Sequence, residues 1–390
     1  MYNSPHQFEP LIPSIIPVIL TDKAAKIVRE AMLLAGAAHP VSRAVIRERV
    51  RSMNSYYSNR IEGQGTHPLN IERALKKQFS DKPDVARLQR LAVAHIEAEI
   101  ELEQHVQAGE SPLSAQFLIA AHHALYSRLT PPDRVTDQGH VVVPGEVRTV
   151  EVKVGEHVPP GHASLPQFLK RLDEVYNHKH GWDIHLLYLA CLHHRAAWIH
   201  PFRDGNGRAV RLQSHCALWA LSDGLWSPGR GLARATGDYY ARLHNADGLR
   251  RGDLDGRGNL TTEGLLEWMH FFLDVCLDQV QFMGRMLALD GMKRRIEALI
   301  TFRHAHDKAV RMEAVLPLYH LFAAGPLTRR EFSQMTGLGE RTARSLISKL
   351  LQDGLIASGS PLGPLRWSLP LDSMSFLFPE LYPEAATKPD

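Results

Sequence analysis

Cysteine is scarce in this sequence, and a long apolar run is missing. Among 390 residues there are three cysteines, Cys191, Cys216 and Cys276, and no two of them form a Cys-x-x-Cys pair. This odd, scattered set excludes a disulfide framework and a cysteine-type structural zinc site. The apolar stretch at residues 11–20 is broken by prolines and is too short to cross a bilayer. We therefore expect an extended segment there, no membrane partner, and a cytoplasmic location.

An excess of charge of one sign is also lacking. The 45 Lys and Arg residues nearly balance the 42 Asp and Glu residues and leave a net charge of +3. That excess is too small to indicate nucleic-acid or membrane binding by itself. There are no internal repeats and no His-Glu-x-x-His zinc motif. We therefore expect the His122-His123 and His193-His194 pairs to pack or to form hydrogen bonds in the core.

Helical periodicity dominates the remaining sequence and predicts a mainly α fold. The expected helices cover residues 24–34, 41–53, 85–105, 114–129, 165–177, 184–199, 208–221, 237–249, 262–280 and 285–304. Residues 141–143 and 147–154 are instead rich in β-branched side chains, and Pro144-Gly145 separates them. This pattern predicts a small β-hairpin within an otherwise helical protein.

The last part of the chain has a different organisation. Short helices are expected at residues 316–323, 329–336 and 341–352, followed by two strands at 354–357 and 365–369. This order is typical of a winged helix-turn-helix. Its third helix carries Arg341, Arg344 and Lys349, which could contact DNA phosphates and base edges. The alternative is a winged helix used for dimerisation or protein docking.

Residues 200–211 concentrate residue types that suit a phosphate site. Gly205, Asn206 and Gly207 precede a predicted helix, where unpaired backbone N–H groups and close backbone approach favour anions. Arg208 and Arg211 stand one turn apart at the start of that helix. Two guanidinium groups beside an anion cradle suit a polyphosphate.

Two further side chains of this loop add chemistry. Asp204 offers a hard oxygen ligand, and nucleotide-bound Mg²⁺ takes one or two protein carboxylates in addition to phosphate oxygens. His200 offers an imidazole, which can take a proton from an attacking hydroxyl near neutral pH. A simple turn would need neither group.

The stretch from His200 to Arg208, together with Arg211, resembles the signature of the Fic family. That signature reads His-x-Phe-x-Asp/Glu-Gly-Asn-Gly-Arg with a further arginine three residues on, and every defining position matches. The resemblance implies a Fic-type helical bundle over residues 112–275. It also implies transfer of AMP from ATP to a hydroxyl of a target protein, with pyrophosphate released.

Residue roles follow from the resemblance alone. It implies that His200 is the general base, that Phe202 anchors the loop, and that Asp204 binds Mg²⁺. The backbone of residues 205–207 would hold phosphates, with Arg208 on the γ-phosphate and Arg211 on the β-phosphate. The hairpin would be a flap that docks the target by strand addition. Gly207 stands where the phosphotransferase branch tends to have lysine, and this favours AMP transfer.

Tyr240 is a separate candidate. It lies where the family often has a tyrosine that contacts the nucleotide, although a helix-face aromatic in the core is an equal alternative.

Ser58-Asn59-Arg60-Ile61-Glu62-Gly63 forms a second motif. Its Ser-x-x-x-Glu spacing misses the capping-box spacing by one residue, and on a helix Ser58 and Glu62 share a face. The segment resembles the inhibitory motif of Fic proteins, which implies that Glu62 pairs with Arg208 and competes with the γ-phosphate. An ordinary exposed glutamate near a helix end is the alternative. The same glutamate could also position a water that removes AMP.

We therefore expect an N-terminal region with the inhibitory motif (1–111), a Fic domain (112–275), a helical connector (276–310), a winged helix-turn-helix (311–371) and a tail (372–390). The leading hypothesis is a self-inhibited protein adenylyltransferase. The alternatives are a DNA-binding regulator that uses the Fic unit as an ATP sensor, and a transferase for another nucleotide. The sequence leaves the target, the modified residue and the presence of a homodimer open.

Overall fold

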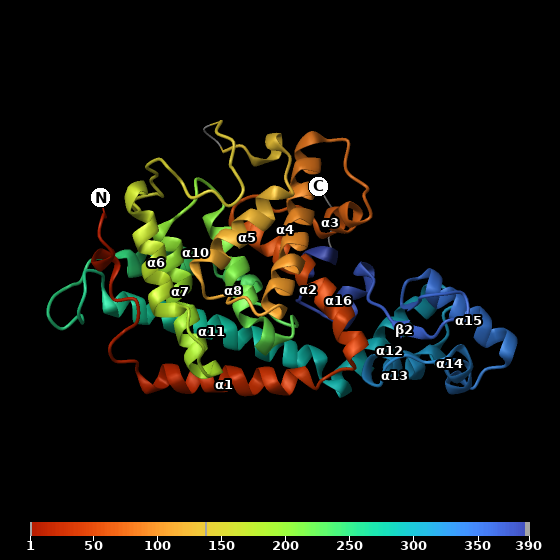
Figure 1. Ribbon diagram of the computed structural model, residues 1–390. Coiled ribbons are helices and arrows are strands. Elements are labelled where there is room, and N and C mark those ends of the chain that lie inside the picture. The colour runs from red at the N-terminus through yellow and green to blue at the C-terminus, as the bar shows by residue number, and fades with distance from the viewer. Residues whose placement is uncertain (1, 137–138, 387–390) are drawn as a thin grey trace.

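The computed structural model describes residues 2–136 and 139–386. Two long helices, α1 (Val18–Ala35) and α11 (Thr262–Leu287), lie side by side along one edge of the molecule (Figure 1). Helix α7 (Trp182–Ile199) packs on both of them and leads into the loop at residues 200–205. The extended segment expected at 11–20 gives way to helix at Val18, directly after Pro17, because proline is well tolerated at a helix start.

Helix α8 (Asn206–Ser222) is the centre of the bundle. It contacts α7, α4 (Pro83–Gln107), α5 (Ala115–Ser127) and α2 (Pro40–Ile61). Almost all of its side chains are buried, including the polar ones that follow the loop. Any residue at the start of α8 is therefore held by neighbours on several sides, which suits a site that needs fixed geometry.

The other helices are α3 (Pro68–Leu75), α6 (Leu165–Tyr176), α9 (Gly229–Arg234), α10 (Thr236–Asp247), α12 (Leu289–His306), α13 (Val315–Ala323), α14 (Arg329–Thr336), α15 (Glu340–Gln352) and α16 (Met374–Leu377). Short 3-10 turns occupy Pro5–Phe8, Pro131–Arg134, His162–Ser164, Met312–Ala314, Leu371–Ser373 and Pro383–Ala386. The mainly α prediction is thus confirmed. Among the described helices, none combines the length and apolar character needed to cross a membrane.

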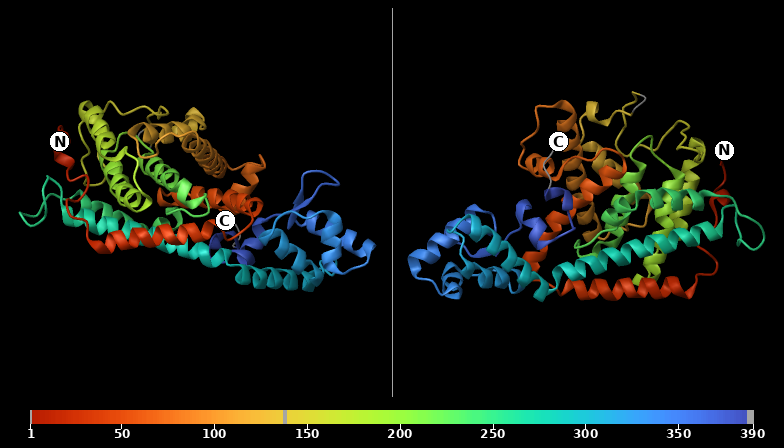
Figure 2. Two further views of the ribbon diagram at one scale, coloured as in Figure 1. Left: turned by 60° about the horizontal axis from the view of Figure 1, so that its bottom comes forward. Right: turned by 180° about the vertical axis from the view of Figure 1, so that it is seen from behind.

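The C-terminal elements form their own cluster at one end of the molecule (Figure 1). Figure 2 shows α12 continuing from the end of α11 toward this cluster. Helices α13, α14 and α15 are followed by β1 (Ile356–Ser358) and β2 (Leu365–Trp367), which pair antiparallel with Ile356 opposite Trp367. These elements match the order expected from the sequence, while their function as a winged helix-turn-helix stays a prediction.

The predicted hairpin is wrong. In the described part of residues 141–154 there is no regular strand, only isolated bridges from Val141 to Val135 and from Val154 to His157. The reason is Arg148, which is 4 % exposed and donates to the backbone carbonyls of Val150 and His200. Its guanidinium takes the Val150 carbonyl and its backbone N–H bonds the Pro201 carbonyl, so two groups that a strand ladder would use are engaged elsewhere.

Residues 372–382, the first part of the segment expected to be a tail, pack on the core of the protein. Helix α16 buries Met374 and Leu377, and the following Phe378, Leu381 and Tyr382 are buried in the same core. Aromatic and aliphatic side chains of this kind remain out of water when a surface is available. Residues 387–390 lie outside the described residues.

Candidate active site

The loop between α7 and α8 contains two residues in the left-handed backbone region. His200 ends α7 with φ 51° and ψ 59°, and Gly205 precedes α8 with φ 79°. A Cβ added to Gly205 would lie 2.4 Å from the ring of Tyr126, so a side chain is excluded there by space as well as by φ. A non-glycine residue held in this region stores strain, which is a feature of functional sites.

The loop is closed by its own side chains. Asn206 accepts the N–H of Phe202 at 2.9 Å and donates to the carbonyl of Phe202 at 2.9 Å. Phe202 is fully buried and stacks on His122 with ring centroids 3.9 Å apart. His122 in turn reaches the carbonyl of Asp204 at 3.1 Å. The sequence placed Asn206 among backbone phosphate ligands, and the structure gives its side chain this closing role in addition.

His200 lies near the amino end of α8, and a hydrogen bond to its backbone carbonyl fixes its position. Nε of Arg148 donates to the carbonyl of His200 at 2.8 Å, which ties the catalytic loop to residues 143–154. Burial lowers the pKa of His200 to about 4, and the nearby His157 and Arg148 act in the same direction. The imidazole is therefore neutral at physiological pH and can accept a proton.

Arg208 is held by three partners. Its guanidinium donates to Gln64 Oε1 at 3.0 Å, to the hydroxyl of Tyr126 at 2.8 Å and to Asp204 Oδ2 at 3.3 Å. Arg208 is 3 % exposed, and its charge faces the carboxylates of Asp204 and Glu62 as well as the guanidinium of Arg211. If Glu62 leaves, the two buried guanidinium groups share one carboxylate, and an anion can then take its place.

Arg211 is held by the last turn of α2. Its Nε donates to Ser58 Oγ at 3.0 Å, and its Nη2 reaches the Ser58 carbonyl at 3.0 Å and Glu62 Oε1 at 2.5 Å. The expectation that Glu62 would pair with Arg208 is therefore wrong. The Arg208 guanidinium bonds Gln64, Tyr126 and Asp204 instead, while Glu62 lies over Gly207 and contacts Arg211.

Glu62 occupies the space over the start of α8. Although burial opposes ionisation, the charges of Arg211 and Arg208 outweigh it and lower the pKa of Glu62. A Cβ added to Gly207 would lie 2.4 Å from Glu62 Oε1. Glycine at this position thus lets an anionic oxygen approach the backbone at the amino end of the helix.

One cavity of about 260 Å³ brings most of the expected site residues together. The residues of the sequence-based site that line it are Glu62, His200, Asn206, Gly207, Arg211 and Tyr240. Four larger hollows, of about 310, 370, 660 and 730 Å³, are lined by no residue of the 200–211 loop, so we assign the site by its chemistry rather than by size.

Tyr240 and Ser58 take different places around this cavity. Tyr240 is 47 % exposed and donates to the Ile61 carbonyl at 3.3 Å, so it borders the cavity instead of filling the core. Ser58 is buried behind Arg211 and supports that side chain.

Asp204 fits a magnesium ligand. Its side chain is 42 % exposed, and the charge of Arg208 outweighs burial and lowers the pKa of Asp204. One partly exposed carboxylate at a helix start matches the preference of nucleotide-bound Mg²⁺ for one or two protein carboxylates. The Tyr126 hydroxyl at 2.8 Å and Arg208 Nη2 at 3.3 Å both donate to Asp204 Oδ2 and orient the carboxylate.

Sequence reasoning missed several supporting residues. Tyr126, Gln64 and Arg148 come from three different segments, and no local pattern marks them. Tyr239, which hydrogen-bonds Arg211 and His193, was passed over for its neighbour Tyr240. The expectation that the paired histidines lie in the core is confirmed for His122, His193 and His194, which are buried and hydrogen-bonded. It is wrong for His123, which is exposed.

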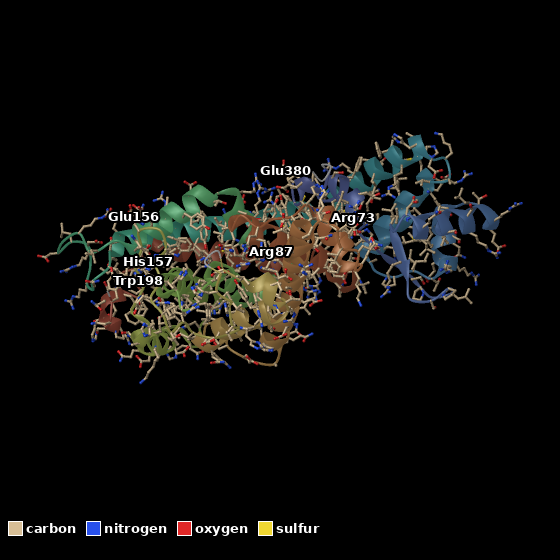
Figure 3. All side chains as sticks on the ribbon, turned by 90° about the horizontal axis from the view of Figure 1, so that it is seen from above. Arg73, Arg87, Glu156, His157, Trp198 and Glu380 are labelled. Carbon is tan, nitrogen blue, oxygen red and sulfur yellow. The ribbon has the colours of Figure 1, made fainter. Side chains whose placement is uncertain are left out.

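The segment after Arg148 also reaches the site. His157 lies against the end of α7, with Nε2 2.8 Å from the carbonyl of Trp198 (Figure 3). His157 and Val154 both line the cavity. The segment expected to be a flap therefore forms one wall of the site without forming strands.

Comparison with known proteins identifies a shared domain. Residues 112–218 match the model of the Fic/DOC family. The protein adenylyltransferase Fic of Drosophila virilis is 43 % identical over 83 residues, which are 20 % of this chain and 17 % of the relative. The Drosophila melanogaster protein of the same name is 42 % identical over 83 residues, with the same coverage. The chain thus spans about a sixth of the length of these curated relatives.

Two solved structures resemble the chain over a longer range. A Fic family protein from Desulfovibrio desulfuricans has a TM-score of 0.50 and 19 % identity, and covers 92 % of this chain and 98 % of its own. A Fic domain containing signaling protein from Bacteroides thetaiotaomicron has a TM-score of 0.52 and 18 % identity, and covers 67 % of this chain and 96 % of its own. At these identities the likeness shows a common fold.

Proposed function

Because the chain carries a Fic/DOC domain at residues 112–218, we propose that it is a protein adenylyltransferase that transfers AMP from ATP to a hydroxyl of a target protein. The observation that carries the proposal is the single cavity that joins a neutral imidazole, His200, to the glycine-bearing start of α8 and to Arg211. The adenylyltransferase name of the Drosophila relatives, which share 43 % identity over 83 residues, agrees with this chemistry.

The reaction needs a base, an anion site and a leaving group. His200 takes the proton of the target hydroxyl as its oxygen attacks the α-phosphorus of ATP. The bond from the α-phosphorus to the bridging oxygen breaks, and pyrophosphate leaves with its electron pair. Backbone N–H groups at residues 205–207 and the guanidinium groups of Arg208 and Arg211 stabilise the phosphates.

Magnesium belongs with this proposal through Asp204. When bound, Mg²⁺ would supply charge neutralisation at the phosphates. Asp204 is oriented for that role by Tyr126, and Arg208 keeps its carboxylate ionised.

We assign residues 143–154 to target docking. Val143, Val150 and Val154 are 51 %, 36 % and 41 % exposed, and the backbone there is not part of a regular sheet among the described residues. An extended target segment could add to such a backbone by main-chain hydrogen bonds. Arg148 would hold that pairing in fixed register with His200.

Glu62 serves as a brake on this activity. Its carboxylate occupies Arg211 at 2.5 Å and the space above Gly207, so a phosphate cannot take both positions while Glu62 remains. ATP can enter only in a shifted pose or after the last turn of α2 moves. The inhibition thus acts through Arg211, the arginine that Glu62 contacts.

The test is AMP transfer by purified wild type, Glu62→Gly and Glu62→Gly/His200→Ala with ATP labelled at the α- or γ-phosphate. We expect α-label on protein with Glu62→Gly, a mass gain of about 329 Da, the AMP residue, and loss of labelling in the double variant. Label from the γ-phosphate would instead indicate phosphotransfer. If Glu62→Gly transfers no more AMP than the wild type does, Glu62 does not act as a brake.

The alternative of DNA binding through α15 gains no support at two of its cations. Lys349 pairs with Asp307 at 2.9 Å and with Asp353 at 2.9 Å, and Arg344 pairs with Glu340. The two acidic partners of Lys349 lower the positive potential at that end of α15, whereas the Arg344–Glu340 pair is exposed and weak.

A further inference from the structure

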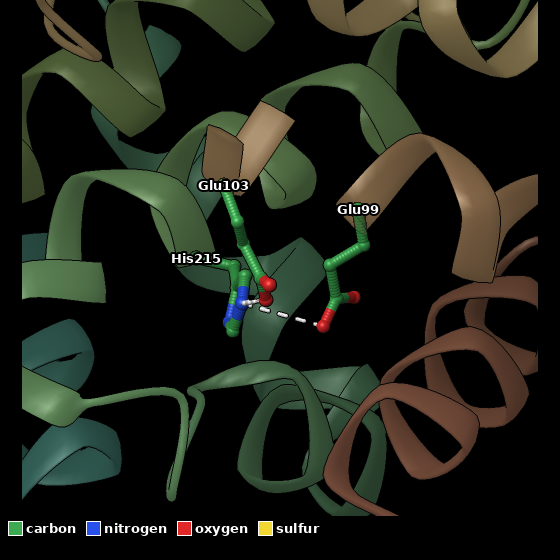
Figure 4. A group of neighbouring side chains, drawn as sticks. All are labelled: Glu99, Glu103 and His215. Atoms are coloured by element: carbon green, nitrogen blue, oxygen red, sulfur yellow. Dashed lines mark hydrogen bonds and ion pairs between the residues drawn. The ribbon is translucent and has the colours of Figure 1, made fainter. Parts of the chain in front are cut away.

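A buried polar cluster joins α2, α4 and α8 outside the catalytic cavity. Nε2 of His215 on α8 lies 3.1 Å from Glu103 Oε1 and 3.3 Å from Glu99 Oε1, both on α4 (Figure 4). Asn54 of α2 donates to Glu99 Oε1 at 3.0 Å, and Nε of Arg51 donates to Glu103 Oε2 at 3.1 Å. All of these carboxyl and imidazole groups are buried.

Polar contacts between His215 and the two glutamates, rather than apolar contacts, join the side chains at the centre of the cluster. Ionised carboxylates only accept hydrogen bonds, so a proton on Nε2 of His215 or on a carboxyl oxygen must lie between these groups. Burial opposes the charge on His215, but Glu99 and Glu103 outweigh it and raise the pKa of His215. Burial raises the pKa of Glu99, so the imidazole and the carboxylates share a proton as one unit near neutral pH.

The cluster is in register with the brake. On α8, His215 follows Arg211 by four residues, and on α2 Asn54 precedes Ser58 by four residues. Arg211 faces Ser58, and His215 faces Asn54 with 3.5 Å between Nδ1 and Nδ2. The two helices thus meet at two polar rungs about 6 Å apart along their axes, one helical turn.

We infer that Asn54 and Glu99 are positioning residues that set α2 against α8 in the register that brings Glu62 to Arg211. Hydrogen bonds are directional, so a polar rung fixes helix register more sharply than apolar packing of the same area. The inference rests on the proposed function, because the brake it positions is a brake on AMP transfer.

The cluster also explains how α2 can be released. Glu99 Oε2, Asn54 Oδ1 and both ring nitrogens of His95 are buried without a hydrogen-bond partner. Each such atom costs free energy in the docked state and would regain hydrogen bonds in water. Two other contacts hold α2 on α4, the Arg51–Glu103 pair and the bond from Ser55 Oγ to the Ala92 carbonyl at 2.8 Å. The Asn54–Glu99 bond is the contact of this interface that lies among unpartnered polar atoms, so its loss favours opening there.

The experiment first breaks the Asn54–Glu99 hydrogen bond and then restores it with the donor and acceptor exchanged. Asn54→Asp places a second carboxylate against Glu99, so α2 should move away and AMP transfer should rise by roughly tenfold or more, as expected when a buried pair is broken. Adding Glu99→Gln lets the new amide donate to Asp at position 54, and activity should return toward the wild-type level. Glu101→Gln, on the face of α4 that binds Arg128, is the matched control.

A double-mutant cycle gives the decisive readout. In the Glu62→Gly background Asn54→Asp should change the rate little, because the brake is already absent. An equal rise in both backgrounds, or no rescue by Glu99→Gln, would overturn the inference. So would a stoichiometric divalent metal in the purified chain that is lost on Glu103→Gln, since a cation would then bridge the cluster.

Hydrogen exchange separates this inference from the proposed activity. If Glu62→Gly transfers no AMP, the proposed function fails. The positioning inference is then judged by amide exchange at residues 54–62, which should speed up in Asn54→Asp and slow again in the rescued double variant. Unchanged exchange in Asn54→Asp would overturn it independently of any activity.

Discussion

Glu62 Oε1 lies in the space that a side chain on Gly207 would take, 2.4 Å from the position of an added Cβ. The same oxygen is 2.5 Å from Nη2 of Arg211. One carboxylate therefore fills both the backbone cradle at the start of α8 and the guanidinium beside it. This double occupancy is the physical basis of the proposed brake, because a phosphate would need both places.

Gly205 should tolerate no side chain. Its φ of 79° and the Tyr126 ring, 2.4 Å from an added Cβ, make Gly205→Ala destabilising by about 1–3 kcal/mol. Gly237→Ala is the matched control, because nothing lies within 4 Å of an added Cβ there. Urea unfolding of both variants checks this, and equal stabilities would contradict it.

We expect His200, the proposed base, to remain neutral at mildly acidic pH, so that AMP transfer continues there. Since the pKa of His200 is lowered to about 4, protonation of the imidazole should not limit kcat/KM until the pH falls well below 6. The pH profile of AMP transfer by Glu62→Gly measures this directly. A fall with its midpoint near the ordinary histidine value of 6.5 would contradict it.

Stability should decrease as the pH falls from 6.5 toward 4. The pKa values of His95, His122 and His200 are lowered to about 3, 4 and 4, so the unfolded chain takes up protons in this range before the folded chain does. Each group then costs on the order of 1–3 kcal/mol of stability. His215, with a raised pKa, acts in the opposite sense but is outnumbered. Unfolding by urea at stepped pH tests the sign, and greater stability at pH 5 than at pH 7 would refute it.

Tyr126→Phe should weaken the use of magnesium. The hydroxyl donates to Asp204 at 2.8 Å and accepts from Arg208 at 2.8 Å, so its loss frees both side chains to turn. In the Glu62→Gly background we expect a higher Mg²⁺ concentration for half-maximal AMP transfer, with the rate recovered by excess Mg²⁺. Tyr176→Phe removes a buried hydroxyl that binds the Leu11 carbonyl away from the site, and should leave the Mg²⁺ dependence unchanged.

The C-terminal segment should help to hold the brake. Glu384 accepts from the Tyr57 hydroxyl at 3.1 Å and from Arg60 at 2.6 Å, both in the last turns of α2 beside Ser58. We expect Glu384→Gln to raise AMP transfer severalfold in the wild-type background and to leave the Glu62→Gly variant unchanged. Glu380→Gln is the control, because Glu380 contributes its backbone carbonyl to Arg230. Equal effects of the two substitutions would argue against a role for this contact.

The catalytic loop was predictable because its information is local. Nine neighbouring residues fix the turn, the glycines and the charges, and the structure places His200, Gly207 and Arg211 around one cavity as expected. Most of the longer helices were predictable for the same reason, since apolar spacing within one segment records which face is buried. The short helices α3, α9 and α16 were not expected, because each has too few residues to show that spacing.

The partner of Glu62 was not predictable, because it depends on the position of α2 along the axis of α8. A shift of one turn separates Arg208 from Arg211, and nothing within either segment measures that shift. The supporting residue Tyr126 is hidden in the same way, since its contacts to Asp204 and Arg208 arise from packing of α5 on α8. The prediction of a hairpin was wrong for a related reason. The buried side chain of Arg148 bonds backbone carbonyls at Val150 and His200, and local β propensity contains no information on such contacts.

Arg148 has a consequence for how a target would be chosen. Its side chain fastens the carbonyl of His200, while its own N–H binds the Pro201 carbonyl at 2.8 Å. The proposed docking backbone and the proposed base therefore move as one piece. The number of residues between the docked part of a target and its hydroxyl would then decide whether that hydroxyl reaches His200. Proteins unrelated in sequence could then share the same modification, provided that each offers a pliable strand with a hydroxyl at the right interval.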